Sequence, residues 1–482
     1  MRHAWTVAAI RDAEARAMAV AGPDALMQRA AAGLAAAILR RLRPERAVPE
    51  ERREERAARH EGRRSGRTYG SRVLLVVGSG NNGGDALFAG AALARRGVRV
   101  TASRAGSGVH EAGWTAFLAA GGREVDAAGA LAGLPAQRLV VDGVAGIGSR
   151  PGLAPEVAAL AAACRAQGVP VVAVDLPSGL APEPPFTDAE HFVADLTVTF
   201  GGLKLCQLLE PARTDCGEVE LVDIGLDLGE PAASQWEEAD LAAAWPVPDA
   251  RSDKYSRGVV GLDTGSVDYP GAAVLGTSGA VHAGAGMVRY FGSPQVGARI
   301  LDRFPNVIVG QGRVQALVLG SGWGDRKDRG VVARAVSAGV PLVVDADGLR
   351  HLAGPGHAGV LLTPHAGELA RLLDRSRDKV EADPVTAVRD AVAATGCTVL
   401  LKGASQYVGS PLDDRLWLAL PGPGWTAQAG SGDVLAGICG ALLAAGLPAR
   451  KAALAGASIQ ALAASRSPGP VPPQDLRLPL PL

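Results

Sequence analysis

Short β-branched apolar runs alternate with alanine-rich stretches of helical character in both halves of this 482-residue chain. In the first half these runs are Val73–Val77, Leu139–Val141, Val169–Val174 and Leu196–Phe200. Strands this short and apolar, separated by helices, pair in parallel and are buried on both faces. The pattern therefore predicts an α/β fold in which helices cover both faces of a parallel sheet.

The alternation stops at about residues 225–250, which mix proline, acidic and small residues, and then resumes. The expected strands of the second half are Ala316–Leu319, Pro341–Val344, Val360–Leu362 and Thr398–Leu401. At about 150 residues per domain, a chain of this length holds two or three domains. We therefore expect a first domain at residues 1–228, a linker at 229–248 and a second domain at 249–482.

Other segments depart from this alternation. Residues 24–42 have apolar side chains at helical spacing and predict an amphipathic helix. Residues 43–71 are dense in interleaved acidic and basic residues, which favours a mobile surface insertion over a nucleic-acid-binding arm.

The run Val434–Ala449 is uncharged but too short to span a bilayer, so we expect a buried helix. The Pro-rich tail 468–482 is expected to be loose.

Composition narrows the possible partners and location. Apolar residues make up 48% and charged residues 20%, which is typical of a globular protein. The 49 basic and 49 acidic residues balance, so the charge gives no support for a polyanionic partner. The five cysteines include no C-x-x-C pair, and the N-terminus carries charges unlike a signal peptide. We therefore expect a cytoplasmic location and no nucleic acid or membrane partner. A homo-oligomer is a separate expectation that composition does not address.

A glycine-rich loop follows the first expected strand. Gly78–Asp85 reads GSGNNGGD and precedes a helix. Glycines at such a turn let backbone amides approach a phosphate, and the helix start adds partial positive charge. The amides and carboxylate of Asn81, Asn82 and Asp85 suit ribose hydroxyls or a cation. The alternative is a structural turn capped by Asn and Asp.

Two more strands end in an aspartate and a glycine turn. Asp142 precedes Gly146 and Gly148, and Asp175 precedes Ser178. Either aspartate alone is commonly a helix cap or part of an Asx turn. Because parallel strands place their carboxyl ends at one edge of a sheet, all three loops are expected to meet at one pocket.

The strings GSGNNGGD, DGVAGIG, VDLPSG and ADLTVTFGGLKL resemble the YjeF N-terminal domain, the NAD(P)H-hydrate epimerase, over roughly residues 5–225 apart from the charged insertion. The resemblance implies a Rossmann-like three-layer α/β/α fold and interconversion of the R and S forms of hydrated NADH and NADPH. It implies substrate contacts by Asn81, Asn82, Gly83, Gly84, Asp85, Gly146, Ile147, Gly148, Ser149, Arg150, Pro151, Gly152 and Asp175. It also implies K+ held by Asn82, Asp142 and Ser178, with Asp142 as the catalytic acid–base group. Ala86 stands where the family usually has glycine.

In the second half, the string AGSGDVLAG at Ala429–Gly437 opens the long apolar helix. Its glycines supply backbone amides for phosphate oxygens, and Asp433 is placed to take a proton from a hydroxyl that attacks the phosphate. The alternative is that Asp433 only caps the helix. A turn of this kind resembles the anion hole and catalytic aspartate of ribokinase-like kinases.

The strings YPGAA, AGAGM, DAD, LTPHAGE and LKG, over roughly residues 250–465, resemble the YjeF C-terminal, carbohydrate-kinase-like dehydratases. The resemblance implies a ribokinase-like three-layer α/β/α fold and dehydration of the S hydrate with ADP and Mg2+, giving AMP and phosphate. It implies nucleotide contacts by Lys402, Gly403, Ala404, Ser405, Gln406 and Gly432, and hydrate contacts by Asp433, His365, Ala272 and Gly322. The chain departs from the family at Asp253–Tyr255 and Gly320–Gly324.

The two activities complement each other, since a dehydratase specific for the S form leaves the R form unused unless an epimerase converts it. One alternative is a kinase of a small alcohol, such as a vitamin precursor, fused to a non-catalytic Rossmann-like binding module. The intact Asn82, Asp85 and Asp142 favour catalysis in the first domain. A metal site at His365 and Glu368 lacks a third ligand in the sequence.

Overall fold

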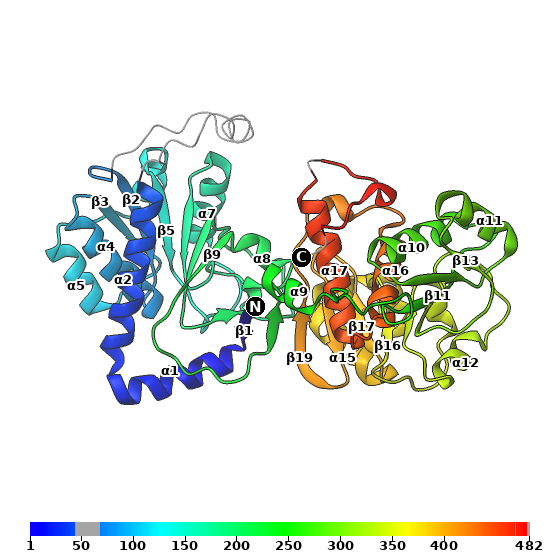
Figure 1. Ribbon diagram of the computed structural model, residues 1–482. Helices are drawn as coiled ribbons and strands as arrows, with labels where there is room; N and C mark the ends of the chain where they lie inside the picture. The colour runs from blue at the N-terminus through cyan, green and yellow to red at the C-terminus, as the bar shows by residue number, and fades with distance from the viewer. Residues whose placement is uncertain (44–67, 468, 480–482) are drawn as a thin grey trace. The chain divides into compact units, whose positions relative to one another are not determined.

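The computed structural model describes residues 1–43, 68–467 and 469–479 (Figure 1). Most of the predicted insertion 43–71, namely residues 44–67, lies outside the described residues. The chain forms two compact units. The N-terminal unit spans Ala4–Pro231, and the C-terminal unit comprises Met1–His3 and Ala232–Leu482.

The N-terminal unit contains a seven-stranded sheet in the order β4-β3-β2-β5-β6-β7-β9, with every neighbouring pair parallel. The strand order reverses between β2 and β5, which is where ligands bind in open α/β sheets. The seven strands of this sheet are β2 (Arg72–Val77), β3 (Arg99–Arg104), β4 (Arg123–Glu124), β5 (Leu139–Gly143), β6 (Val171–Val174), β7 (Leu196–Phe200) and β9 (Glu218–Val222). Two further short strands, β1 (Arg2–Trp5) and β8 (Leu203–Lys204), pair with each other in parallel. The helices of the unit are α1 (Val7–Ala21), α2 (Pro23–Leu42), α4 (Asn81–Ala94), α5 (Glu111–Ala119), α6 (Ala127–Ala132), α7 (Pro155–Gln167) and α8 (Ala212–Asp215).

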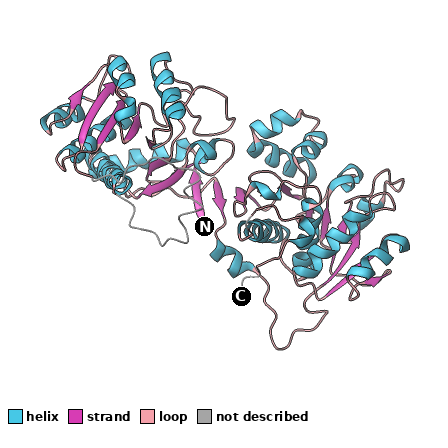
Figure 2. Cartoon of the chain, turned by 90° about the horizontal axis from the view of Figure 1, so that it is seen from above, coloured by secondary structure: helices cyan, strands magenta, loops and turns pink. Residues whose placement is uncertain are grey.

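Helices cover both faces of this sheet, as the side chains of β2 show, because they point alternately to one face and the other. Val73, Leu75 and Val77 pack into one core with α2 and α4. Leu74 and Val76 point to the opposite face and pack with α6 and α7. Successive strand residues face opposite sides, so a strand buried on both faces is apolar throughout. The three-layer arrangement is visible in Figure 2.

The C-terminal unit contains a second sheet, in the order β13-β12-β11-β14-β15-β16-β17-β18-β19-β10. The strands from β13 to β17 are parallel, whereas β18 runs antiparallel to β17 and β19. The strands are β10 (Ala233–Gln235), β11 (Val259–Asp263), β12 (Met287–Tyr290), β13 (Ile308–Val309), β14 (Ala316–Leu319), β15 (Leu342–Val344), β16 (Val360–Leu362), β17 (Thr398–Leu401), β18 (Tyr407–Ser410) and β19 (Asp413–Leu418). The helices are α9 (Glu238–Ala244), α10 (Pro270–His282), α11 (Pro294–Arg303), α12 (Val331–Ser337), α13 (Ala366–Leu372), α14 (Arg377–Ala382), α15 (Pro384–Thr395), α16 (Ser431–Ala444) and α17 (Ala449–Ser465).

Helices α10 and α16 pack backbone against backbone because glycines face one another. A Cβ on Gly279 would lie 2.1 Å from the carbonyl oxygen of Val434, and one on Gly437 would lie 1.9 Å from that of Gly276. Helix α16 is buried from Val434 to Ala444. This close contact fixes the start of α16 relative to the sheet.

The predicted strands and the amphipathic helix are present, with ends shifted by up to two residues. Residues 229–248, expected to link the domains, contain β10 and α9. In the Pro-rich tail that was expected to be loose, residues 469–479 contact the rest of the C-terminal unit. The side chain of Leu478 packs against the C-terminal core, and the carbonyl oxygen of Val471 accepts a hydrogen bond from Gln428 Nε2 at 3.1 Å. This Pro-rich segment therefore has both an apolar and a backbone contact with the unit.

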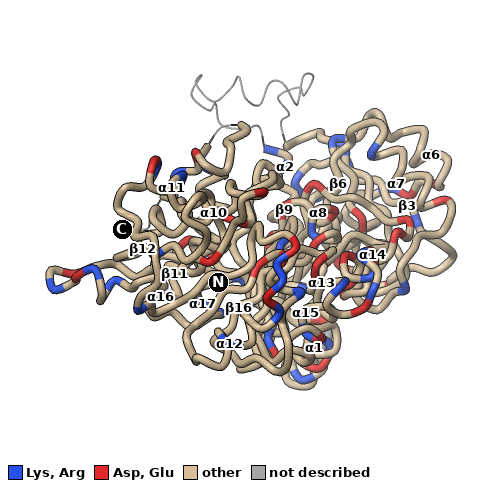
Figure 3. Tube along the Cα trace, turned by 90° about the vertical axis from the view of Figure 1, so that its right-hand side faces the viewer, with Lys and Arg blue, Asp and Glu red and all other residues tan. Residues whose placement is uncertain are grey.

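Charged residues of both signs are interleaved along the trace, as Figure 3 shows, in line with the formal net charge of zero. Within the described residues, none of the helices combines the length and the apolar character needed to cross a membrane.

Candidate active sites

The glycine loop of the N-terminal unit lies at the carboxyl end of β2 and begins helix α4. Gly80 precedes the helix, and none of the described side chains caps it by a hydrogen bond. Free amides at a helix start favour anionic ligand groups. The loop lines a pocket of about 560 Å³, a volume in the range of small-molecule sites.

Most of the predicted contacts of this unit meet at the pocket. Those that line it are Asn81, Asn82, Asp85, Gly146, Ile147, Gly148, Ser149 and Asp175. Gly83 and Gly84 are buried within α4 behind the loop. Arg150, Pro151 and Gly152 lie outside the pocket lining, and the Gly152 amide donates to the carbonyl of Gly179 at 2.9 Å.

The three predicted cation ligands come from three strand ends and converge on Ala145. Asp142 accepts hydrogen bonds from the Ser178 hydroxyl at 2.6 Å and from the Ser178 amide at 2.7 Å. The Ser178 hydroxyl also lies 2.9 Å from the Ala145 amide nitrogen. Asn82 Nδ2 donates to the carbonyl oxygens of Ala145 at 3.2 Å and Val174 at 2.7 Å. Carboxylate, hydroxyl, amide and carbonyl oxygens are thus gathered in one small region.

Asp142 is a buried carboxyl without a basic side chain as partner among the described residues. Its exposed fraction is 0%, and it does not line the pocket. Burial raises the pKa of Asp142 to about 6, although hydrogen bonds from Ser178 and Val144 oppose the rise. A nearby cation stabilises a buried carboxylate, so this set of oxygen atoms fits a monovalent cation.

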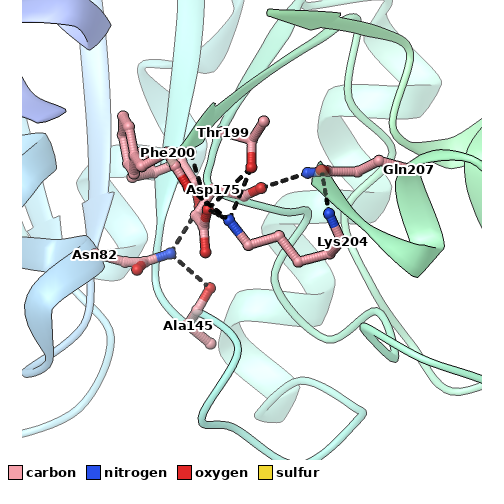
Figure 4. Close-up of polar contacts among 8 residues, drawn as sticks. Asn82, Ala145, Asp175, Thr199, Phe200, Lys204 and Gln207 are labelled. Carbon is pink, nitrogen blue, oxygen red and sulfur yellow. Dashed lines mark hydrogen bonds and ion pairs between the residues drawn. The ribbon is translucent and has the colours of Figure 1, made fainter. Parts of the chain in front are cut away.

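A buried network holds Asp175, which follows β6 with a left-handed φ of 69°. Its carboxylate forms an ion pair with Lys204 and accepts a hydrogen bond from the Thr199 hydroxyl at 3.1 Å (Figure 4). Lys204 Nζ also donates to Thr199 at 2.9 Å and to the carbonyl of Phe200 at 3.2 Å. Gln207 Nε2 donates to the Asp175 carbonyl at 2.6 Å. The network fixes one side of a carboxylate that also lines the pocket.

Two groups of residues at this site were not predicted from the sequence. Arg11 and Glu14 of α1 line the pocket. They lie three residues apart and so share a face of the helix, but charged residues at that spacing are common on exposed helices. Lys204 and Gln207 lie behind Asp175, and only the resemblance of the string GGLKL pointed to that segment.

The second site of the molecule lies at the start of α16 in the C-terminal unit. Gly430 adopts a left-handed φ of 93°, and none of the described side chains caps the helix. Asp433 lies in the first turn and is half-buried. Burial, followed by the charge of Asp345, raises its pKa to about 7, while Lys402 and a hydrogen bond from Ser321 oppose the rise.

Asp345 organises the side chains around Asp433. It is 1% exposed and accepts hydrogen bonds from Lys402 Nζ at 2.7 Å, from Ser321 at 2.8 Å and from Thr363 at 2.8 Å. Burial lowers the pKa of Lys402, but the negative charges around it, Asp345 first, outweigh burial and raise it overall. Asp345 is the first residue of the string DAD, but the sequence predicted no role for it.

The predicted phosphate-binding residues lie together. A Cβ on Gly432 would lie 3.1 Å from Lys402 Nζ, so the ammonium group is beside the glycine turn. Lys402 forms a parallel β-bridge with His365. Gly403, Ala404, Ser405 and Gln406 connect β17 to β18 directly after Lys402. Gln406 Oε1 is buried without a hydrogen-bond partner, which leaves an acceptor for a ligand.

The remaining predicted contacts have defined local roles. His365 Nδ1 accepts from the Gly367 amide at 3.0 Å and so caps α13, and Glu368 completes the capping box. Ala272 and Gly322 are neighbours, since a Cβ on Gly322 would lie 2.6 Å from that of Ala272. Across the described residues there is no group of three His, Cys, Asp or Glu side chains that could hold a metal ion.

Comparisons with known proteins match a family to each unit. The profile of the family described as YjeF-related protein N-terminus matches residues 23–206, and that of NAD(P)H-hydrate dehydratase matches residues 260–470. A solved structure of the ADP/ATP-dependent NAD(P)H-hydrate dehydratase of Bacillus subtilis, co-crystallised with ATP/Mg2+, is 26% identical, with a TM-score of 0.46. The match covers 48% of this chain and 88% of that one.

Two relatives match over nearly their whole length. The bifunctional NAD(P)H-hydrate repair enzyme Nnr of Mycobacterium leprae is 45% identical, covering 99% of this chain and 98% of the relative. The enzyme of the same name from Mycobacterium tuberculosis H37Rv is 44% identical, covering 94% and 91%. With both domains matched in the same order, the chain belongs to the bifunctional NAD(P)H-hydrate repair enzymes.

Proposed function

We propose that the N-terminal unit interconverts the R and S forms of hydrated NADH and NADPH, and that the C-terminal unit dehydrates the S form with ADP. One observation carries this assignment. Each unit has its own uncapped glycine-rich helix start with a carboxyl group of raised pKa nearby. Each therefore has both an anion-binding element and a group suited to proton transfer.

In the N-terminal unit the pocket at the β2–β5 switch receives the hydrate. Amides at the start of α4 bind its anionic groups, and the side chains of Asn81, Asp85 and Asp175 bind its hydroxyl and carboxamide groups. K+ would be held by Asn82, Asp142 and Ser178. Its positive charge would stabilise negative charge that develops on the substrate. The buried Asp142, which has no basic partner among the described residues, supports this assignment.

In the C-terminal unit the carboxylate of Asp433 takes the proton of the hydrate's hydroxyl while that oxygen attacks the terminal phosphorus of ADP. The amides of the Gly430–Gly432 turn and the ammonium of Lys402 stabilise the charge of the transferring phosphoryl group. AMP leaves, and loss of phosphate from the phosphorylated carbon C6 together with a proton from the neighbouring carbon C5 then forms the C5–C6 double bond of NAD(P)H. Asp345 positions Lys402 through their 2.7 Å ion pair.

Mg2+ fits this unit as part of the nucleotide complex. Mg2+ commonly binds phosphate oxygens, waters and one or two carboxylates, and the half-buried Asp433 and buried Asp345 place negative charge next to the turn. Bound there, the ion would neutralise the charge of the phosphates.

The test is to incubate the purified chain with each separated hydrate. In the presence of ADP and Mg2+ both R and S hydrates should yield reduced cofactor, measured by its absorbance. Without nucleotide, the hydrates should interconvert with no reduced cofactor formed. A chain that phosphorylates a stable alcohol and leaves the hydrates unchanged would instead be a small-alcohol kinase.

A further inference from the structure

Three carboxyl groups face the N-terminal pocket from three different elements. Asp85 belongs to α4, Asp175 follows β6, and Glu14 belongs to α1. Glu14 lies outside every sequence motif that pointed to this site. It makes no hydrogen bond or ion pair with a described residue. Its carboxylate is therefore available to a ligand in the pocket.

The three groups differ in their partners. Asp175 is paired with Lys204, as Figure 4 shows. Asp85 is 6% exposed, and its Oδ1 is buried with no hydrogen-bond partner. Burial, then the charges of Asp175 and Glu14, raises the pKa of Asp85 well above its usual range. Burial and the charge of Asp175 also raise the pKa of Glu14, against the opposing charges of Lys204 and Arg11.

Access to the pocket separates these groups from Asp142. Asp142 is fully buried, accepts its hydrogen bonds from Ser178 and Val144, and does not line the pocket. A proton-transfer group has to come within hydrogen-bond distance of the substrate. Asp142 is thus placed to hold a cation and the Ser178 turn, while Glu14 and Asp85 have the access that proton transfer needs.

We propose that Glu14 is a catalytic residue of the epimerase site and exchanges protons with the substrate together with Asp85. This inference rests on the proposed epimerase function. Asp85 is the more buried of the two, with an Oδ1 that has no hydrogen-bond partner, so we assign it the proton. Glu14 is only partly buried, and we assign it the role of the base.

The hydrate is a hemiaminal, with a hydroxyl on C6 next to the ring nitrogen N1. Glu14 takes the hydroxyl proton, and the O–H electron pair forms the second C6–O bond. The C6–N1 bond breaks, and its electron pair stays on N1, which takes a proton from Asp85. The ring is now open, with an aldehyde at C6 and N–H at N1. Rotation about C5–C6 followed by the reverse transfers closes the ring with C6 inverted, with no net change in atoms, charge or oxidation state.

The surroundings of Glu14 contain groups of both signs. Arg11 lies on its own helix, one turn away, and a Cβ on Gly148 would lie 2.8 Å from Arg11 Nη2, which places α1 beside the predicted substrate turn. The charged and titratable groups that line the same pocket, or stand directly behind it, are Arg11, Asp24, Asp85, His110, Asp175 and Lys204.

The experiment compares Glu14→Gln with Asp12→Asn in the full chain. Both changes remove a carboxylate from α1, but Asp12 is exposed and outside the pocket lining. Glu14→Gln should lower kcat of epimerisation by about a hundredfold to ten-thousandfold, as expected for loss of a general base. It should also remove the acidic limb of the pH profile. Asp12→Asn should behave as the wild type, and Glu14→Asp should recover part of the rate.

Thermal unfolding of the N-terminal unit serves as the folding control and should match the wild type in all three variants. Dehydration of the pure S hydrate with ADP, which belongs to the other unit, should also stay normal. Because Glu14 and Asp85 act as one unit, Glu14→Gln/Asp85→Asn should lose little more than either single change. A raised KM with unchanged kcat and pH profile, or wild-type kinetics, would overturn the catalytic role of Glu14. If the wild-type chain itself fails to interconvert the hydrates, the proposed function fails instead.

Discussion

Asp142 of the N-terminal unit and Asp433 of the C-terminal unit are both carboxyl groups with a raised pKa, and burial is the largest cause in each case. The pKa is about 6 for Asp142 and about 7 for Asp433. Asp142 is 0% exposed and accepts hydrogen bonds from Ser178. Asp433 is half-buried and lies in the first turn of α16, close enough to Lys402 for that charge to oppose the rise in pKa. A raised pKa alone thus does not identify a proton-transfer group, since the group also needs access to the substrate.

The largest effect is expected at Asp433. Asp433→Asn keeps the shape of the side chain but removes the base, so dehydration of the S hydrate should fall about a hundredfold to ten-thousandfold. No described side chain caps α16, so its fold does not depend on the carboxylate. The thermal unfolding curve and the epimerase rate should match those of the wild type. Near-normal dehydration would show that Asp433 is not the base.

Substitution of Asp142, unlike that of Asp433, should lower the stability of its unit. Asp142→Ala leaves the buried amide and hydroxyl donors of Ser178 without an acceptor, which costs about 1–3 kcal/mol. Thermal denaturation should show a less stable N-terminal unit, and epimerisation should be lost with the cation site, while dehydration of the S hydrate continues. An Asp142→Ala protein that interconverts the hydrates at the wild-type rate would refute the role of this cluster.

The pH dependence of dehydration tests whether Asp433 is the base. Asp433 acts as a base only when deprotonated, and its pKa is about 7. The value of kcat/KM should therefore be constant above that pH and fall about tenfold per pH unit below it. Steady-state rates from pH 5.5 to 8 would measure this. A flat profile would mean that a group other than Asp433 takes the proton.

The smallest effect is expected in the substrate turn after β5. Arg150 is exposed and outside the pocket lining, so Arg150→Ala should change the epimerase rate by less than about twofold. Gly146 is the matched control, because a Cβ there would lie 2.5 Å from Asn82 Oδ1 and displace it. Gly146→Ala should therefore lose most of the activity. Equal losses in both variants would show that the whole turn contacts the substrate.

The sequence predicted the layered fold because its strands are buried on both faces and carry a continuous apolar pattern, as in Val73–Val77. It did not predict strands such as β3 and β12. Arg99–Arg104 and Met287–Tyr290 contain arginine and polar residues, and pairing within the sheet overrides their weak local preference.

For the sites, glycine turns next to Asn and Asp were visible in the sequence, since each is one continuous segment. Glu14 was not, because α1 and β6 are far apart in the chain and only folding places Glu14 and Asp175 at one pocket. Lys204 and Asp345 were missed as functional residues for a related reason. Their roles depend on ion pairs with Asp175 and Lys402, and such pairs leave no spacing signal.

Complementation by mixing tests the central claim, that two separate sites act in sequence. Asp433→Asn supplies only the epimerase, and Asp142→Ala supplies only the dehydratase. With pure R hydrate, ADP and Mg2+, under conditions where spontaneous epimerisation is slow, each variant alone should form little reduced cofactor. An equimolar mixture should form it at a rate close to that of the wild type. If the mixture stays as inactive as the separate variants while both remain folded, the two activities do not reside in independent sites.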